Sequence, residues 1–354
     1  MGDTDMLDSQ QGLYSMPFEG DRHSHTLMVF PSLASVYSEA DLQASQEEVV
    51  NIANAIARFE SVHMYTREEL MVKARSMAGT NVLVKAARVD QLWARDSAPT
   101  YVYDKQGSRT AINFNFNYWG KKLPPTGDEG LAAQVAEQES HPTARSRLTT
   151  EGGAIEHDGQ GTFLATESSL INDNRNPGMS KAEIERELRA MLGVSSFIWI
   201  PGVKGHDITD YHIDILARFV RPGVVVLSKP ASSAPDFVVN AYEEAQKVLS
   251  NSRDARGREL TVYTCQEPDT SLLGPPDESN EVVASYVNYH LVNGAVILPT
   301  YGQQEPDNQA LELFTRLFPE REVVQVYLNM LPRSGGGIHC ATQQVIAPLR
   351  TQQY

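Results

Sequence analysis

Cys340 is the residue whose type and neighbours most directly suggest chemistry. It ends the stretch Ser334-Gly-Gly-Gly-Ile-His-Cys340, in which three glycines let the backbone approach another group closely and His339 stands beside the thiol. A phosphate-binding loop would need a Lys followed by Ser or Thr, which this stretch lacks. A single cysteine is more often a buried core thiol. This context favours a nucleophile, whereas Cys265 lies in an ordinary strand pattern and is assigned to the core.

The segment from His206 to Asp214 is a second candidate site. It continues into apolar residues, so we expect a strand on which His212, Asp214 and Asp210 point to one face. Charged side chains on a buried strand are costly unless they are used. With His206 they could form a metal site, or they could form an acid/base pair that faces a cationic substrate. A solvated loop is the better interpretation only for Asp207.

Two shorter motifs are weak when each is taken alone. Trp93-Ala-Arg-Asp-Ser-Ala-Pro99 follows an apolar strand and predicts a loop at the carboxyl end of that strand, although an Arg95–Asp96 pair is more often a structural salt bridge. Glu151-Gly-Gly stands just before a strand, where the glutamate could reach a buried site. Paired glycines often mark only a turn.

Short β-branched runs alternate with stretches of helical period, which indicates an α/β fold. We expect helices at 40–59, 181–192, 236–250 and 308–317, the second with a capping box of Ser180 and Glu183. We expect strands at 27–30, 82–85, 100–103, 162–166, 197–201, 224–228, 260–263, 296–299 and 323–327. Gly161, Gly223 and Gly294 each open such a strand, and their spacing of roughly 60 to 70 residues matches a repeated β-β-α-β unit. Glycine before a strand is also common in any α/β protein, so the repeat stays open here.

The chain has 354 residues and reads as one domain with a short tail. Residues 1–15 are polar and without helix caps, so we expect a flexible tail before a single catalytic domain at 16–354. Segment 123–149 contains Pro, Gly and Ser around a short helical stretch, and we interpret it as a surface excursion within that domain.

The composition excludes several classes of protein. Lys and Arg number 30 against 45 Asp and Glu, and the net charge of -15 repels nucleic-acid phosphates and anionic lipid while favouring cationic partners. No apolar run approaches the length of a membrane span, and the first residues lack the apolar core of a secretory signal. Two cysteines cannot build a disulfide framework. We therefore expect a cytoplasmic protein that binds neither nucleic acid nor membrane, and the oligomeric state stays open.

Taken in order, the motifs form a recognisable set. Trp93-x-Arg-Asp-x-x-Pro, Glu151-Gly-Gly, Asn172-x-Asn-Arg-Asn-Pro, Asp207-x-Thr-Asp-x-His-x-Asp214 and Gly-Gly-Gly-Ile-His-Cys340 together resemble the agmatine deiminase and bacterial-type peptidylarginine deiminase family. This family belongs to the guanidino-group-modifying enzymes. The resemblance extends from Met16-Pro-Phe-Glu19 and His23 to Gln344, and five motifs in order are specific where one alone would be weak.

The resemblance implies a fold and a reaction. The fold would be a five-bladed α/β propeller of pseudo-symmetric β-β-α-β units around a central pocket. The reaction would be hydrolytic conversion of a guanidinium to a ureido group with release of ammonia, without a metal or cofactor. Cys340 would form a covalent thiouronium intermediate, His212 would act as general acid and base, and Glu151 would orient His212. Asp96 and Asp214 would hold the guanidinium, and family position assigns substrate contacts to Trp93, Asp90, Asp210, Trp119 and Arg95.

The substrate is less clear than the reaction, because several residues depart from the agmatine-type pattern. These departures are Ala98, Ala154, Tyr211 and Gly337, with Leu27 and Phe30 where tryptophans are usual. No evident pair of arginines would hold a free α-carboxylate, although Arg95, Arg175 and Arg218 stay candidates. An arginine within a peptide or a small arginine-containing metabolite is therefore considered beside agmatine.

Two other interpretations stay open. The first is a metal-dependent hydrolase that uses His206, Asp210, His212 and Asp214, which chelators would inactivate and which would not need Cys340. The second is a non-catalytic protein that captures guanidinium ligands in an acidic pocket, for which the thiol has no use.

Overall fold

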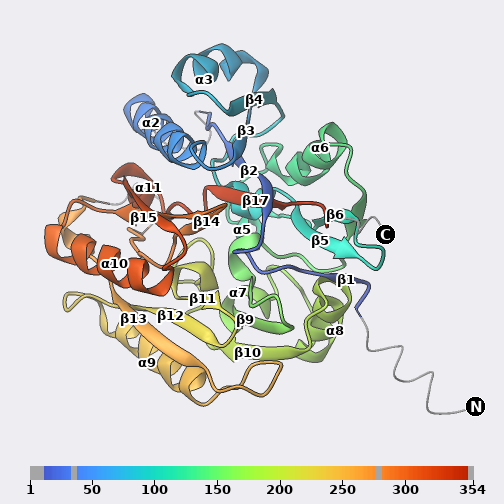
Figure 1. Ribbon diagram of the computed structural model, residues 1–354, viewed down its shortest axis with the longest axis vertical. Coiled ribbons are helices and arrows are strands. Elements are labelled where there is room, and N and C mark those ends of the chain that lie inside the picture. The colour runs from blue at the N-terminus through green and yellow to red at the C-terminus, as the bar shows by residue number, and fades with distance from the viewer. Residues whose placement is uncertain (1–11, 33–37, 276–280, 350–354) are drawn as a thin grey trace, which may run out of the picture.

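The computed structural model describes residues 12–32, 38–275 and 281–349, and the strands of these residues form five separate sheets. Figure 1 shows the sheets distributed around the centre of the molecule, with helices α2, α6, α8, α9 and α10 at the periphery. Each sheet mixes antiparallel and parallel pairs. The expected α/β class is confirmed.

Three of the sheets contain three strands each and share one connection. An antiparallel hairpin comes first, and a crossover through a helix then places the third strand parallel to the second. A parallel neighbour requires such a crossover, because the chain must first travel back along the strand. The first unit consists of β8 (Glu156–His157), β9 (Thr162–Thr166), α7 (Glu167–Leu170), α8 (Lys181–Leu192) and β10 (Ser196–Ile200). The second consists of β11 (Ala217–Arg221), β12 (Val224–Lys229), α9 (Asp236–Ser250) and β13 (Thr261–Gln266). The third consists of β14 (His290–Val292), β15 (Ala295–Thr300), α10 (Gln304–Leu317) and β16 (Glu322–Tyr327).

The other two sheets have the same order of antiparallel and parallel pairs and one additional strand each, but in one of them the antiparallel pair joins the two ends of the chain and is not a hairpin. One sheet contains β5 (Thr100–Asp104), β6 (Arg109–Asn113), α6 (Leu131–Gln138) and β7 (Thr143–Arg145), with β1 (Tyr14–Ser15) at its edge. The other contains β17 (Thr342–Ile346), β2 (His23–Val29), α2 (Glu39–Ile56) and β3 (Ser61–Thr66), followed by α3 (Met71–Met77) and β4 (Val82–Ala86). Short helices α4 (Ala94–Ser97), α5 (Tyr118–Lys121) and α11 (Met330–Arg333) lie in the connections. Because β17 pairs antiparallel with β2, one sheet joins the two ends of the chain.

The repeated glycines mark the same position in three units. Gly161, Gly223 and Gly294 immediately precede β9, β12 and β15, and their φ angles are 100°, 78° and 79°. Glycine adopts such positive φ angles at little cost, and they turn the chain between the two strands of a hairpin. The structural repeat that the glycine spacing suggested is therefore confirmed for these units.

Two expectations about segments outside the predicted strands and helices need adjustment. Residues 1–11 of the expected tail lie outside the described residues, while Tyr14 and Ser15 form β1 and pair with β5. Segment 123–149 is more than a surface excursion, because it supplies α6 and β7, the crossover helix and third strand of their sheet.

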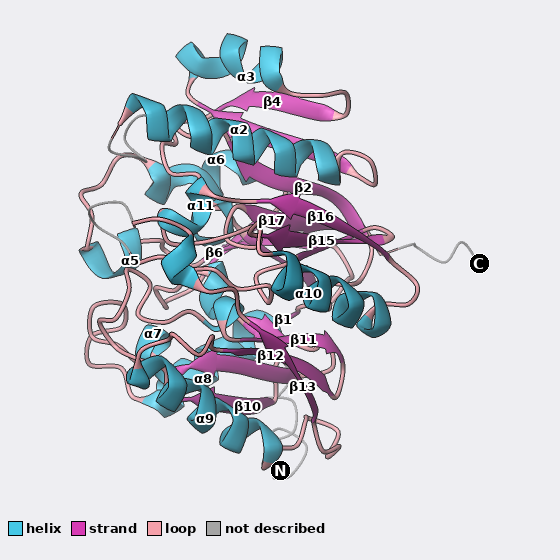
Figure 2. Ribbon diagram, turned by 90° about the vertical axis from the view of Figure 1, so that its left-hand side faces the viewer, coloured by secondary structure: helices cyan, strands magenta, loops and turns pink. Residues whose placement is uncertain are grey.

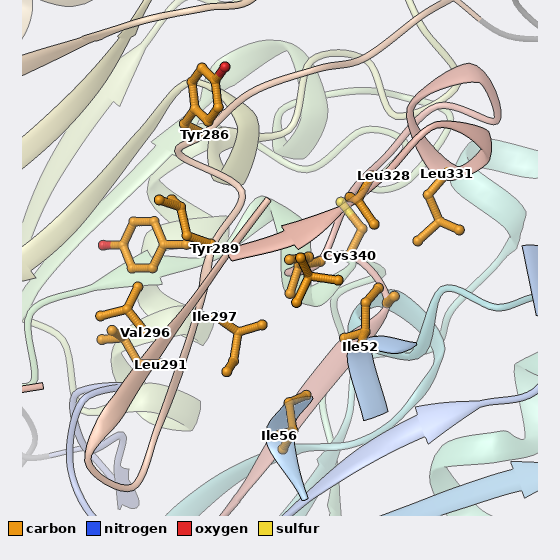
Figure 3. Close-up of a cluster of buried hydrophobic side chains, with 14 of the residues drawn as sticks. Ile52, Ile56, Tyr286, Tyr289, Leu291, Val296, Ile297, Leu328, Leu331 and Cys340 are labelled. Carbon is orange, nitrogen blue, oxygen red and sulfur yellow. The ribbon is translucent and has the colours of Figure 1, made fainter. Parts of the chain in front are cut away.

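Apolar packing joins elements of different sheets around Cys340. The largest group of buried apolar side chains joins α2 to the strands β14 and β15 and reaches Cys340 (Figure 3). Ile52 and Ile56 come from α2, Ile297 comes from β15, and Leu328 precedes α11. Figure 2 shows α2 and α10 lying along the strands of their sheets, and both helices contribute buried apolar side chains to this group. Among the described helices, none combines the length and the apolar character that crossing a bilayer requires.

Candidate active site

Cys340 lies between α11 and β17 at the end of the glycine run. The thiol is 8% exposed, and Asn288 Nδ2 donates a hydrogen bond to its Sγ at 3.2 Å. A Cβ atom on Gly336 would lie 2.6 Å from the Trp93 ring, and one on Gly337 would lie 2.7 Å from Asn288 Oδ1. The glycines thus let this segment pass against two side chains of the site. The close backbone approach expected from the sequence is confirmed.

His212 faces a buried carboxylate. Its Nε2 lies 3.3 Å from Glu151 Oε2, and Arg175 Nε donates to the other oxygen of Glu151 at 2.9 Å. The side chain of Glu151 is wholly buried, so this ion pair and the ring hold it in place. Burial works to raise the pKa of Glu151, but Arg175 and His212 lower it, which keeps the carboxylate ionised.

The strand expected around His212 is wrong. Asp210 and Tyr211 have positive φ angles of 61° and 73°, and the next residues form a 3-10 turn at Ile213–Ile215. The strand begins only at Ala217, as β11. His212 and Asp214 nevertheless reach the same site, because the turn brings both side chains round to the buried side.

Asp96 stands on α4 and is held by two donors. Trp119 Nε1 donates to its Oδ2 at 2.8 Å, and the backbone N–H of Gly153 donates to its Oδ1 at 3.0 Å. Burial raises the pKa of Asp96 to about 6, and the charges of Glu151 and Asp214 act in the same direction against the effect of His212.

The four groups converge on one place beside Gly153. A Cβ atom built there would lie 2.5 Å from His212 Nδ1, 3.0 Å from Asp96 Oδ1 and 3.1 Å from Asp214 Oδ2. Cys340 Sγ lies 3.5 Å from the same Asp214 oxygen. Five predicted catalytic residues, Cys340, His212, Asp214, Asp96 and Glu151, are therefore brought together from four separate stretches of the chain.

The charges of the site suit a cation. Burial lowers the pKa of His212, but Asp96 and Glu151 outweigh it and raise that pKa to about 9, so the ring is protonated at neutral pH. Burial and the carboxylates of Asp214 and Asp96 raise the pKa of Cys340 well above that of a free thiol. Asp214 Oδ1 is buried and has no hydrogen-bond partner among the described residues. A cation with N–H groups can donate hydrogen bonds to this oxygen, and its charge favours the thiolate.

The residues expected to contact substrate are placed less uniformly. Trp93 lies against the glycine run and Trp119 bonds to Asp96, so both border the site. Asp90 instead holds the guanidinium of Arg67 and the Ser32 hydroxyl. Neither of its contacts reaches Cys340.

Asp210 and the three candidate arginines form internal ion pairs. Asp210 accepts from Arg175 at 2.5 Å and from Lys122 at 2.8 Å. Arg95 is buried, and its Nε and Nη1 donate to the carbonyl of His339 and to Gln344. Its Nη2 lies 3.7 Å from Glu19 Oε2 and has no hydrogen-bond partner among the described residues. Arg218 pairs with Glu19 at 2.7 Å and with Glu156 at 3.1 Å. Among the described residues these arginines are therefore committed to internal partners and do not form a clamp for a free α-carboxylate.

The metal-binding set suggested by the sequence is not assembled. His206 pairs with Glu281 at 3.0 Å and packs on Phe237, while Asp210 is bound to Arg175. Two groups of His and carboxylate side chains in the described part of the chain are close enough to hold an ion, and neither contains any of those four residues. One group is His23, Glu60 and His290, and the other is His25, His63 and Glu139. The interpretation as a metal hydrolase on His206, Asp210, His212 and Asp214 is therefore wrong.

Three contacts of the site were not predicted from the sequence. Asn288 contacts Cys340, Glu19 contacts His339, and Arg175 fixes Glu151. Asn288 stands in Ser285-Tyr-Val-Asn288, which carries no signal of chemistry. Arg175 and Glu19 stand in stretches that carried the family resemblance, and only the fold reveals their partners.

Comparison with known proteins defines the class. The model of the Porphyromonas-type peptidyl-arginine deiminases matches residues 15–345. The agmatine deiminase of Pseudomonas aeruginosa is 36% identical over 95% of this chain and 96% of its own, and that of Stutzerimonas stutzeri is 35% identical over 96% and 97%. The solved agmatine deiminase of Enterococcus faecalis superposes with a TM-score of 0.88 at 28% identity and covers 99% of both chains.

Fold, site and relatives together define a hydrolase that deiminates guanidino groups. The chain belongs to the Porphyromonas-type peptidyl-arginine deiminase family.

Proposed function

We propose that this protein is an agmatine deiminase that works through a covalent intermediate on Cys340, and that its five sheets are the blades of an α/β propeller around the site. The supporting observation is the convergence of Cys340, His212, Asp214 and Asp96 beside Gly153. The full-length similarity to the agmatine deiminases of Pseudomonas aeruginosa and Stutzerimonas stutzeri supports the substrate.

Binding comes first in the proposed reaction. A guanidinium is planar and carries N–H groups on all sides, which carboxylates bind in pairs. Asp96 and Asp214 both lie beside Gly153, and Asp96 together with the free Oδ1 of Asp214 would take these N–H groups. The central carbon then faces Cys340. The bound cation also lowers the pKa of the thiol, which burial and the carboxylates raise in the empty site.

The thiolate attacks the guanidinium carbon and forms a C–S bond, which gives a tetrahedral adduct. Protonated His212 donates its proton to the departing nitrogen, so ammonia leaves and a thiouronium remains on Cys340. His212, now neutral, takes a proton from water as the water attacks the same carbon. The C–S bond then breaks as the new hydroxyl group loses its proton, which ammonia takes up. The products are a ureido group, ammonium and the restored thiolate, and His212 is protonated again. Glu151 keeps the ring oriented throughout.

A small substrate fits the burial of the site better than a peptide. Cys340 is 8% exposed, Asp96 is 7% exposed and Asp214 is 0% exposed. Arginine carries an α-carboxylate, and the buried Arg95, Arg175 and Arg218 are already paired. Agmatine lacks that carboxylate. A small molecule that contains a blocked arginine is the second candidate, because it lacks the free carboxylate as well.

Ammonia and ureido product should be measured with agmatine, free arginine and an arginine blocked at both ends. We expect turnover of agmatine that falls by at least about 10³-fold in Cys340→Ser. Turnover of the blocked arginine alone would replace the proposed substrate and retain the chemistry. Binding of all three without any product would mean that the protein only captures guanidines.

A further inference from the structure

His339 has no role in the reaction as described so far, yet it lies between two carboxylates. Its Nδ1 is 2.8 Å from Asp214 Oδ2, and its Nε2 is 2.8 Å from Glu19 Oε2. The side chain is 1% exposed. Both contacts are short enough to be hydrogen bonds, and water does not reach the ring.

The chemistry of these groups determines where the protons are. An ionised carboxylate only accepts hydrogen bonds, so each of the two contacts needs a proton on a ring nitrogen or on a carboxyl group. Arg218 Nη2 donates to Glu19 Oε2 at 2.7 Å, and the N–H of Leu291 donates to Glu19 Oε1 at 3.0 Å. These donors keep Glu19 ionised, and burial is outweighed by Arg218 and His339 so that the pKa of Glu19 is well below its usual range.

Asp214 is ionised for a similar reason. Burial raises its pKa, but His339 and His212 lower it below the usual value for aspartate. Burial lowers the pKa of His339, as do Arg218 and Arg95, against the opposing effect of Glu19 and Asp214. The two short contacts nevertheless need two protons among the three groups, and the ring supplies both only as an imidazolium. Three basic residues from other elements surround the His339 ring, and each pairs with a carboxylate. Arg95 and His290 pair with Glu19, and Arg218 pairs with Glu156.

The ring also determines which oxygen of Asp214 is free. Oδ2 is bound by His339 and by the Cys340 thiol, whereas Oδ1 has no hydrogen-bond partner within the described residues. His339 is itself held by its backbone, since its N–H donates to Asn288 Oδ1 at 3.0 Å and its carbonyl accepts from Arg95 Nε at 3.2 Å.

We propose that His339 is a positioning residue which, as an imidazolium anchored by Glu19, turns Asp214 Oδ1 toward the guanidinium and offsets the negative charge around Cys340. This inference rests on the proposed function for the role of Asp214. The charge on His339 can be tested without any substrate.

Two substitutions separate the two ring contacts. The amide nitrogen of Asn replaces Nδ1, so His339→Asn keeps a donor toward Asp214 but loses the charge and the link to Glu19. The amide of Gln replaces Nε2, so His339→Gln keeps the link to Glu19 and loses the donor to Asp214. The matched control is His290→Gln, because His290 is also buried and lies 3.4 Å from Glu19 Oε1 but does not touch Asp214.

The first readout is the pH dependence of Cys340 alkylation by iodoacetamide in the ligand-free protein. Removal of a neighbouring cation raises the pKa of a thiol, so we expect the midpoint to move to higher pH in both His339 variants by about one pH unit. It should stay near the wild-type value in His290→Gln. An unchanged midpoint in His339→Asn, with thermal unfolding showing a folded protein, would overturn the proposed charge whatever the enzyme's substrate is.

The second readout is steady-state turnover of agmatine. Loss of orientation at a reacting group costs about 100-fold, so we expect kcat to fall by about that factor in His339→Gln and by clearly less in His339→Asn. Equal losses in the two variants, or the same loss in His290→Gln, would show that only packing matters. Absence of turnover in the wild-type protein would instead contradict the proposed function and leave the alkylation result standing.

Discussion

At the scale of single residues, the site combines a thiol whose pKa is raised with carboxylates that can bind a cation. Burial, Asp214 and Asp96 all raise the pKa of Cys340, while Asn288 donates to its sulfur. Without a bound cation, the thiol form of Cys340 is therefore favoured over the thiolate, which is the form that attacks. Substrate charge is the natural way to restore it, because a guanidinium between Asp96 and Asp214 adds a positive charge beside the sulfur.

Cys340 should consequently react with iodoacetamide slowly at neutral pH and faster when a small, non-reacting guanidine is bound. The expected acceleration comes from the lower pKa of the thiol next to a cation. It can be followed as the rate of alkylation with and without guanidinium chloride at low, non-denaturing concentration, with sodium chloride as the control for ionic strength. A rate that guanidinium only decreases at every pH would show that the ligand shields the thiol and does not activate it.

In the proposed reaction, activity should depend on pH with a limb on each side. Burial raises the pKa of Asp96 to about 6, and this carboxylate must be ionised to hold the substrate, so kcat/KM should fall as the pH drops below about 6. His212 has a pKa raised to about 9 by Asp96 and Glu151 against burial, and it must be protonated to release ammonia, so kcat should fall above about 9. The upper limb is measured as kcat at saturating agmatine, because the raised pKa of the Cys340 thiol in the free enzyme would add a rise to kcat/KM. A kcat that keeps rising above the upper value would contradict the role of His212 as an acid.

At the scale of elements, the site depends on short irregular segments held by the regular ones. The turn Gly152–Ala154 places Gly153 against His212, Asp96 and Asp214, where hydrogen is the only side chain that fits. The sequence predicted the regular elements α8 and α9 with their observed bounds, and the capping box at Ser180 is confirmed. It missed β8 and β14, where two or three residues carry no readable period. It also missed the longer strands β3, β6 and β17.

Gly153→Ala should preserve folding and impair catalysis. The new Cβ would lie 2.5 Å from His212 Nδ1, so the ring has to move away from the reacting groups. A displacement of this kind costs about 100-fold in kcat. Gly130→Ala is the matched control, because its Cβ would meet only the flexible Gln134 amide at 3.5 Å. Equal activity of the two variants would show that the turn is less tightly packed than the structure indicates.

At the scale of the whole molecule, net charge and topology act together. The chain carries a charge of -15, and its acidic residues attract cations over the distance that salt leaves unscreened. The pairing of β17 with β2 joins the last described strand to the first long one, so Cys340 just before β17 is held against residues from the N-terminal half. The cytoplasmic location expected from the composition stays a prediction.

Raising the ionic strength should lower kcat/KM for agmatine several-fold, because both ends of this substrate are cationic and salt screens the attraction. A guanidine of the same length with an uncharged tail is the control, and its dependence on salt should be weaker. Both series need only initial rates at substrate concentrations below KM. Equal slopes for the two substrates would mean that the net charge does not steer the substrate.

The sequence by itself determined the class of fold and the family, and it named the candidate reacting groups. Cys340, His212, Asp214, Asp96 and Glu151 stand in motifs whose order and spacing could be read without coordinates. The tertiary structure decided what those groups contact. It replaced the expected strand at His212 with a turn, separated His206 from the site, and assigned Arg175, Asn288 and Glu19 to Glu151, Cys340 and His339. The physical reason is that the hydrophobic periodicity of a segment reflects only its own secondary structure. These contacts instead join residues far apart in the chain and form only after the sheets have packed.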